Sequence, residues 1–288
     1  MKKILLLVLI LGLMTTSSAL GSEAITMQDV YDAHQLETLL ASHENVLVRQ
    51  ILRGKEGEGE SVICMNDEFC YTSTEGWGMY VTDNSCYYRE GDICSRVIYI
   101  APDGLEDMTS IRAILSTILD SLTLKEEIQS VTEEDGRITV TSMLSKELLE
   151  ELGDGEENVS SGRFEYVLDA KTHAPVRGEA FYTYEDGTKR DLICEYAYDT
   201  EMTEDMKAMM ELDRQTEDLR TVTLVFYPGT EEENTVSVQV PKGVDVELYT
   251  ASGIDDKFEV YTDAACTEPF VSFGEYTSDT TLYIKWVE

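Results

Sequence analysis

The side chains that most often carry out catalysis are scarce in this chain of 288 residues. Its three histidines are His34, His43 and His173. The first two fall in or just after the first predicted helix, and the third lies in a Lys-Thr-His-Ala-Pro turn, where an exposed loop residue is expected. There is no Gly-x-Ser-x-Gly elbow, His-Glu-x-x-His pair or Walker-type phosphate loop. We therefore predict no catalytic residues, no metal site and no cofactor; an enzyme with an unfamiliar site is kept as an alternative.

The cysteines are better suited to disulfides than to metal binding, because their number is even and the chain carries an export signal, described next. The disulfide candidates are Cys64, Cys70, Cys86 and Cys94. The first two flank a turn at residues 66–68, and the last two flank a turn that ends at Gly91. Each pair could face across its own hairpin, or the two hairpins could be joined to each other. We expect at least one disulfide among the four, a buried free thiol at Cys194 and an unpaired Cys266.

The first 24 residues have the layout of a secretory signal peptide. Two lysines follow Met1, an apolar run extends from Ile4 to Met14, and small residues follow. That run is too short to span a bilayer, and no later segment is apolar enough to do so. The neighbourhood of Ser22 holds no cysteine for lipid attachment. We expect a mature chain that is secreted, or held at the cell surface without a covalent bond, and that has no transmembrane segment.

The net charge of the chain limits the kinds of partner that it can bind. It has 57 acidic and 22 basic residues, a net charge of −35 at pH 7. Such a surface repels phosphate backbones and anionic lipid headgroups, so acidic membranes are poor partners and no nucleic-acid partner is predicted. No EF-hand spacing appears in the Asp-rich turns, so the acidity is interpreted as a means of keeping an exported protein soluble.

The apolar pattern predicts two helices among many short strands. The helices are predicted over Met27 to Ser42, after a capping-box variant at Thr26, and over Ile111 to Leu122. Strands are predicted between turn residues throughout the rest of the chain as far as Tyr198. Their ranges are 46–52, 60–65, 69–74, 79–82, 86–89, 93–100, 128–133, 138–143, 164–169, 179–185 and 190–198. Their spacing is typical of antiparallel hairpins.

One sequence segment within this series of strands is similar to a segment of a known family. Residues 164–176 read Phe-Glu-Tyr-Val-Leu-Asp-Ala-Lys-Thr-His-Ala-Pro-Val, a strand, an Asp-x-Lys-Thr turn, an x-Pro step and a return strand. Together with the order of elements from Ile25 to Thr203, it resembles the half-barrel of the bacterial lipoprotein-carrier (LolA-like) superfamily. The resemblance implies an α+β, mostly antiparallel fold, a half-barrel sheet with two covering helices. The alternative is a generic antiparallel sheet with two helices.

The last part of the chain resembles a second family. It closes on Val260 to Phe270 and on Tyr-Thr-Ser-Asp-Thr-Thr-Leu-Tyr-Ile-Lys-Trp at 276–286. With the strands predicted at 221–226, 235–240, 246–249, 258–261 and 281–286, this is similar to the internalin-type B-repeat (Listeria/Bacteroides repeat). The resemblance implies a small β-grasp-like module of a bacterial secreted or cell-surface protein. The chain departs from the family at Glu259-Val260, where Gly-Trp is usual.

These patterns divide the chain into four predicted segments: signal peptide 1–24, half-barrel domain 25–203, acidic linker 204–220, in which a short helix is favoured, and β-module 221–288.

The LolA-like resemblance also implies where a ligand would bind. The concave face of a half-barrel is apolar and lies under the helices, so strand alternation selects its lining. The candidates are Ile138, Val140, Phe164, Tyr166, Leu168, Leu192, Tyr196 and Tyr198. The preferred hypothesis is a non-catalytic exported protein that binds a hydrophobic ligand, such as a lipid or acyl chain, or a protein partner. A structural or adhesion protein in which these residues form a filled core is the main alternative.

Overall fold

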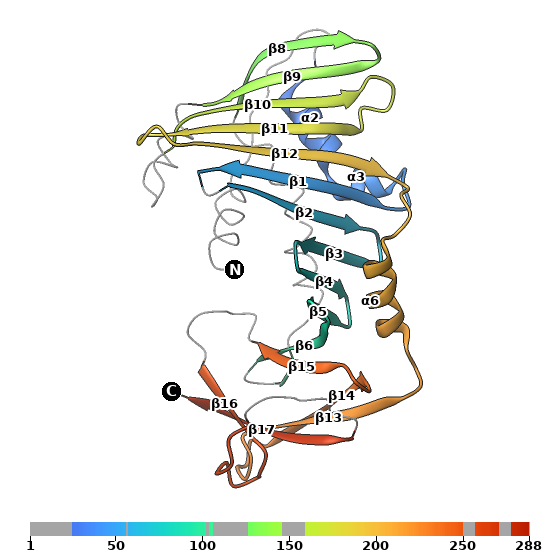
Figure 1. Ribbon diagram of the computed structural model, residues 1–288, viewed down its shortest axis with the longest axis vertical. Helices are drawn as coiled ribbons and strands as arrows, with labels where there is room; N and C mark the ends of the chain where they lie inside the picture. Colours follow the sequence, from blue (N-terminus) through green and yellow to red (C-terminus); the bar gives the residue numbers. More distant parts are fainter. Residues whose placement is uncertain are drawn as a thin grey trace. The chain divides into compact units, whose positions relative to one another are not determined.

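The computed structural model describes residues 25–55, 57–101, 104–105, 126–145, 159–249, 257–270 and 278–287 (Figure 1). The predicted signal peptide and the helix predicted over residues 111–122 lie outside them. The described residues are mostly antiparallel β-structure with few helices, as predicted for an α+β half-barrel. The chain divides into two compact units, Met1–Glu75 with Ala113–Glu201 and Gly76–Arg112 with Met202–Glu288. The predicted domain limits at residues 203 and 220 stay a prediction.

The first unit is built on one open antiparallel sheet. In spatial order its described strands are β3-β2-β1-β12-β11-β10-β9-β8. Their bounds are Phe69–Thr74, Gly57–Met65, Val46–Gly54, Lys189–Tyr198, Pro175–Tyr184, Val159–Asp169, Arg137–Leu144 and Glu126–Glu134. Most begin and end close to their predicted limits; β10 and β11 extend further toward the N-terminus, to Val159 and Pro175. The antiparallel meander is therefore confirmed.

The first predicted helix is two helices in the structure. α2 spans Met27–His34 and α3 spans Leu36–Leu40, with Gln35 between them in an extended conformation (φ −64°, ψ 128°). Neither glycine nor proline stands at this break, so the sequence gives no local signal for it. The predicted capping box is confirmed: Thr26 Oγ1 accepts from the Asp29 amide at 3.2 Å, and the Asp29 carboxylate accepts from the Thr26 amide at 2.7 Å.

The second unit holds a short sheet crossed by a helix. Its strands are β4 (Trp77–Thr82), β5 (Cys86–Glu90), β6 (Ile93–Ala101), β7 (Gly104–Leu105) and β15 (Asp245–Tyr249). β15 pairs in parallel with β6, so this strand, predicted as part of the C-terminal module, extends a different sheet. The predicted helix of the acidic segment is α6 (Glu204–Arg214), in which Met206 and Met209 are buried.

The remaining strands of the second unit form a four-stranded sheet. Its order is β14-β13-β17-β16, with bounds Asn234–Pro241, Leu219–Phe226, Thr280–Val287 and Lys257–Tyr261. The first and last of these strands in the sequence, β13 and β17, pair in parallel at the centre. This is the arrangement expected of a β-grasp-like module, whereas membership of the B-repeat family stays a prediction.

None of the helices in the described ranges combines the length and the apolar character that crossing a bilayer requires.

Candidate ligand-binding face

The register of the first sheet brings the eight predicted lining residues onto one face. Directly paired residues of an antiparallel ladder point to the same side, and the side alternates along each strand. Tyr166 pairs with Val140 and Leu168 with Ile138, while Phe164 and Leu192 both pair with Ala180. On β1, Val48 pairs with Tyr196 and Val46 with Tyr198. We call this the inner face, and it contains Ile138, Val140, Phe164, Tyr166, Leu168, Leu192, Tyr196 and Tyr198.

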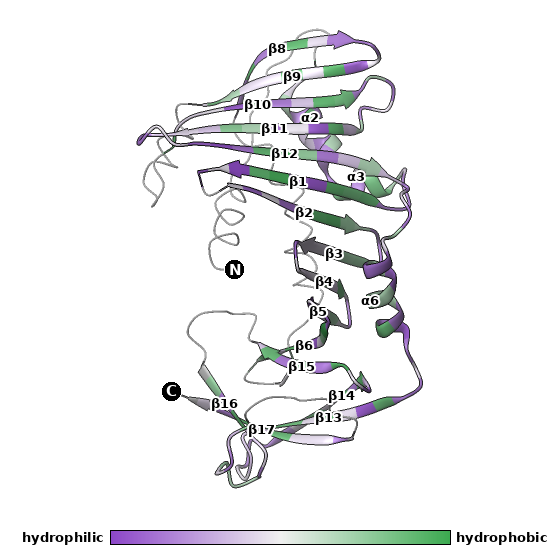
Figure 2. Ribbon diagram, in the orientation of Figure 1, coloured by the Kyte–Doolittle hydropathy of each residue, from purple (hydrophilic) through white to green (hydrophobic). Residues whose placement is uncertain are grey.

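The two helices pack on the inner face and fill the space above it. Val30 of α2 joins a core cluster with Val140 and Leu168, whose exposed fractions are 0% and 1%. Leu39 of α3 joins a second cluster with Val48 and Tyr196. In Figure 1 both helices lie behind the sheet, and Figure 2 shows hydrophobic stretches along β1, β2 and β12. The lining residues are thus core side chains in this structure, as the filled-core alternative also requires.

His34 is the unexpected member of the inner-face core. Its ring is 1% exposed and lies edge-on to the rings of Tyr166 and Tyr196, at centroid distances of 5.6 and 5.5 Å. Its Nδ1 lies 2.7 Å from the carbonyl oxygen of Val30. Because a carbonyl only accepts, Nδ1 carries the proton and Nε2 is a lone-pair acceptor. Burial lowers the pKa of His34 to about 4, so the ring is neutral at pH 7.

Tyr166, Tyr196 and Tyr198, the three predicted lining tyrosines, differ in the hydrogen bonds of their hydroxyl groups. Tyr166 donates to Glu126 Oε1 at 2.7 Å, and Ser142 donates to the other oxygen of the same carboxylate. Tyr198 donates to the Pro175 carbonyl at 2.6 Å. The Tyr196 hydroxyl and His34 Nε2, in contrast, are buried with no hydrogen-bond partner. Buried polar groups normally have partners, so these two atoms stand out in the core of the inner face. Gln35 Nε2, at the break between α2 and α3, is also buried without a partner.

A sequence signal for His34 was available. His34 follows Val30 by four residues on one helix, which places the two side chains on the same helix face. Since Val30 belongs to the apolar stripe, His34 is expected to point into the core with it. The other two histidines lie outside this core. The ring of His43 stacks on that of Tyr198 with a centroid distance of 4.2 Å. His173 is exposed in the turn that follows β10, as predicted.

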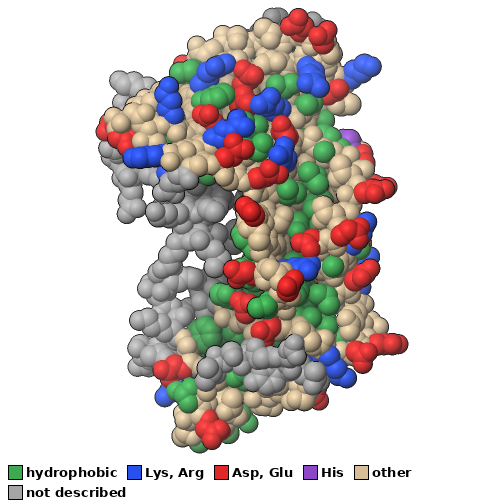
Figure 3. All heavy atoms as spheres, in the orientation of Figure 1, with side chains coloured by type: hydrophobic (Ala, Val, Ile, Leu, Met, Phe, Trp, Pro, Cys, Tyr) green, Lys and Arg blue, Asp and Glu red, His purple; other side chains and the backbone are tan. Residues whose placement is uncertain are grey.

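The opposite face of the same sheet is charged. Arg49 bonds Glu60 at 2.7 Å and Glu195 at 3.2 Å across neighbouring strands, and Arg177 pairs with Glu179. Figure 3, which looks onto this side, shows Lys and Arg mixed with Asp and Glu over these strands. Among the described residues, the inner face combines apolar side chains with cover by α2 and α3.

The structure corrects part of the disulfide prediction. Among the described residues, none of the four candidate cysteines forms a disulfide. Cys64 pairs with Tyr71 whereas Cys70 pairs with Met65, so the two thiols point to opposite faces of their hairpin. The same holds for Cys86, opposite Val97, and Cys94, opposite Arg89. Pairing across either hairpin is excluded by this register; a bond that joins the two hairpins stays a prediction.

The two remaining cysteines are free thiols in this structure. Cys194 is a buried thiol, and burial raises its pKa to about 12. Cys266 is half-buried and unpaired.

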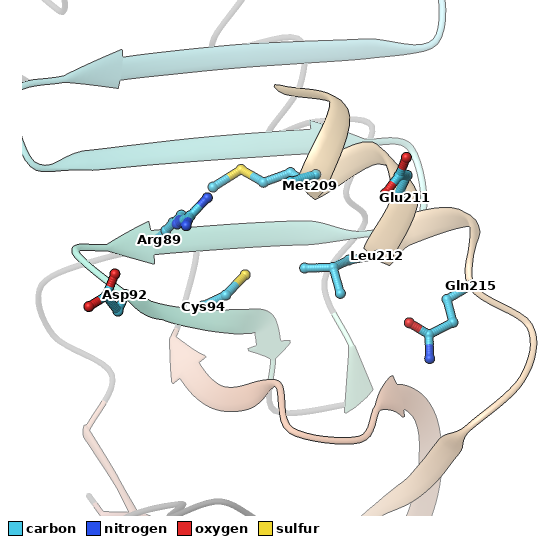
Figure 4. Close-up of a pocket in the computed structure, with 8 residues that line it drawn as sticks. Arg89, Asp92, Cys94, Met209, Glu211, Leu212 and Gln215 are labelled. Carbon is cyan, nitrogen blue, oxygen red and sulfur yellow. The ribbon is translucent and has the colours of Figure 1, made fainter. Parts of the chain in front are cut away.

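A cavity in the second unit was not anticipated. It has a volume of about 380 Å³ and lies between α6 and the β5–β6 hairpin (Figure 4). Figure 4 shows Met209 reaching toward Arg89 and Leu212 pointing toward Cys94. Burial raises the pKa of the Cys94 thiol to about 11, so the thiol is protonated at neutral pH and is a poor nucleophile.

The described ranges, 25–55, 57–101, 104–105, 126–145, 159–249, 257–270 and 278–287, contain no group of three His, Cys, Asp or Glu side chains placed to hold a metal ion.

Comparisons with known proteins give structural likenesses alone. No protein-family model matches the chain, and no curated protein matches it. The chain is similar to the lipoprotein LppX of Mycobacterium tuberculosis (12% identity, TM-score 0.36, 62% of this chain and 99% of that one). It is also similar to LprF of Mycobacterium bovis (13% identity, TM-score 0.33, 64% of this chain and 97% of that one). A third similar structure is a LolA superfamily protein of Nitrosomonas europaea (7% identity, TM-score 0.25, 64% of this chain and 97% of that one). Because these TM-scores all lie below 0.5, function has to be argued from the chain's own residues.

Proposed function

We propose that this chain is a non-catalytic, exported bacterial binding protein, and that the inner face of its first unit holds a hydrophobic ligand such as a lipid or acyl chain. The observation that carries the proposal is the register of the sheet, which gathers all eight predicted lining residues on one face. Export follows from the signal-peptide pattern of residues 1–24 and stays part of the proposal.

A ligand would enter between the helices and the sheet. α2 and α3 span only Met27–His34 and Leu36–Leu40, and Gln35 interrupts them. Helices this short gain little stability of their own and stay in place through the side chains that they bury. In α2 those side chains are Val30, Ala33 and His34, and in α3 Leu39. A hydrophobic ligand would replace these contacts with its own apolar surface, at a similar gain per unit of buried area.

Dye displacement with a matched pair of variants tests this proposal. Ala180 lies on the inner face and is 2% exposed, whereas Thr183 of the same strand lies on the charged face. We expect the mature protein to bind the hydrophobic dye 1-anilinonaphthalene-8-sulfonate and a long-chain alcohol to displace it. Ala180→Phe fills the volume that the ligand would occupy and should weaken dye binding about tenfold or more, whereas Thr183→Phe should leave it unchanged.

Circular dichroism checks that both variants fold. Equal dye affinity of the two variants would place the dye elsewhere and count against the inner face. No saturable dye or alcohol binding by the unsubstituted protein would favour the alternative of a filled core.

A further inference from the structure

We infer that the ligand of the inner face carries a hydroxyl group that donates a hydrogen bond to His34 Nε2 and accepts one from the Tyr196 hydroxyl. This inference rests on the proposed function and adds the chemical class of the ligand: a long-chain alcohol, or a glycerolipid with a free hydroxyl. Both polar atoms lie in the core between α2 and the sheet, on rings whose centroids are 5.5 Å apart.

His34 Nε2 and the Tyr196 hydroxyl are both buried at a cost in free energy. His34 is 1% exposed and Tyr196 9%, and neither His34 Nε2 nor the Tyr196 hydroxyl has a partner. A buried polar group without a hydrogen bond costs roughly 1–3 kcal/mol. Neighbouring Tyr166 shows how the same face satisfies a buried hydroxyl, by means of the Glu126 carboxylate at 2.7 Å. The sheet gives Tyr196 no such partner.

Together, His34 Nε2 and the Tyr196 hydroxyl select one kind of ligand group. His34 Nε2 can only accept, because Nδ1 donates to the Val30 carbonyl. The Tyr196 hydroxyl can donate. An alcohol hydroxyl has one hydrogen to give and lone pairs to receive, so a single group satisfies both atoms. An ionised carboxylate has no hydrogen to give to Nε2, and an ether oxygen has none either.

The surroundings of these two atoms suit the hydrocarbon part of such a ligand. Besides the ring of Tyr166, which lies against His34, the two core clusters of this face hold aliphatic side chains, among them Val30 and Val140 in one and Leu39 and Val48 in the other. They would contact a hydrocarbon chain. Fatty acids, whose carboxylate is ionised at pH 7, fit the apolar part of this environment but not its polar centre.

The test compares three probes of equal chain length on the full mature protein: 1-hexadecanol, its methyl ether and hexadecanoate. Their affinities are measured by displacement of the bound dye at pH 7.5. We expect the alcohol to bind about tenfold more tightly than the ether, which corresponds to one well-formed hydrogen-bonding group in a buried site. Hexadecanoate should bind more weakly than the alcohol.

Two variants identify the atoms responsible. In His34→Leu the preference for the alcohol should fall to about threefold or less, while affinity for the ether stays as it was. In Tyr196→Phe both probes should bind more weakly, because the alcohol oxygen and the ether oxygen each accept a hydrogen bond from the Tyr196 hydroxyl. Tyr196→Phe removes one oxygen and keeps the ring, so it still tests the proposed hydroxyl site if His34→Leu does not fold. Equal affinities of alcohol and ether for the unsubstituted protein would overturn this inference and leave the proposed function standing. If none of the three probes binds, the proposed function itself fails.

Discussion

At the scale of single residues, the buried ring of His34 makes the stability of the folded protein depend on pH, and this dependence can be measured. Its pKa is about 4 in the folded protein because of burial, against an ordinary value of 6.5. Since the folded pKa lies below the unfolded one, the unfolded chain binds more protons between pH 6.5 and 4, and stability falls as the pH is lowered through that window. The full loss is about 3 kcal/mol.

Urea unfolding between pH 7.5 and 4.5 checks this value. The unsubstituted protein should lose stability more steeply than His34→Leu, which lacks the titrating group. His173→Asn is the matched control, because His173 is exposed with a φ of 58°, a conformation that asparagine tolerates. The control should follow the unsubstituted protein. Parallel curves for all three proteins would show that His34 is not buried as described.

At the scale of elements, the packing of β9 against β10 depends on a glycine. A methyl group added at Gly162 would lie 2.5 Å from Leu144 Cδ1 and 2.7 Å from its Cγ. Leu144 is itself nearly buried on the inner face. We therefore expect Gly162→Ala to destabilise the first unit by about 1–3 kcal/mol through overpacking.

A double-mutant cycle separates this clash from a general intolerance of the strand. Leu144→Ala alone opens a cavity, but in the Gly162→Ala background it also removes the clash, so the double variant should be more stable than the sum of the two single effects predicts. Strictly additive free energies of unfolding would mean that the two side chains do not meet.

The elements also show what the sequence could and could not provide. Alternation along β9, β10 and β12 was sufficient to place the eight lining residues on one face, because a strand has a period of two and the hairpin turns fix its register. The break at Gln35 could not be foreseen, since no helix-breaking residue marks it. The pairing of β15 with β6 joins residues far apart in the sequence, which local patterns do not encode. The cysteine hairpins were placed correctly. Of the two disulfide arrangements left open, pairing across each hairpin was wrong, because a shift of one residue in register turns a side chain to the other face.

At the scale of the whole molecule, charge and apolar character are separated. The sequence carries 35 net negative charges, while the inner face of the first unit is lined by apolar and aromatic side chains under two short helices. A protein with this distribution stays soluble and repels anionic surfaces, yet can enclose a neutral hydrophobic molecule. Neutral lipids that carry a hydroxyl meet both conditions.

Native mass spectrometry of the mature protein, purified without detergent from the bacterium that produces it, tests the central claim most directly. We predict a mass above that of the bare chain by one lipid of several hundred daltons, released under denaturing conditions, and lost or reduced in Ala180→Phe but not in Thr183→Phe. A single species at the mass of the bare chain, both as purified and after incubation with 1-hexadecanol, would contradict the claim and identify the inner face as a filled core.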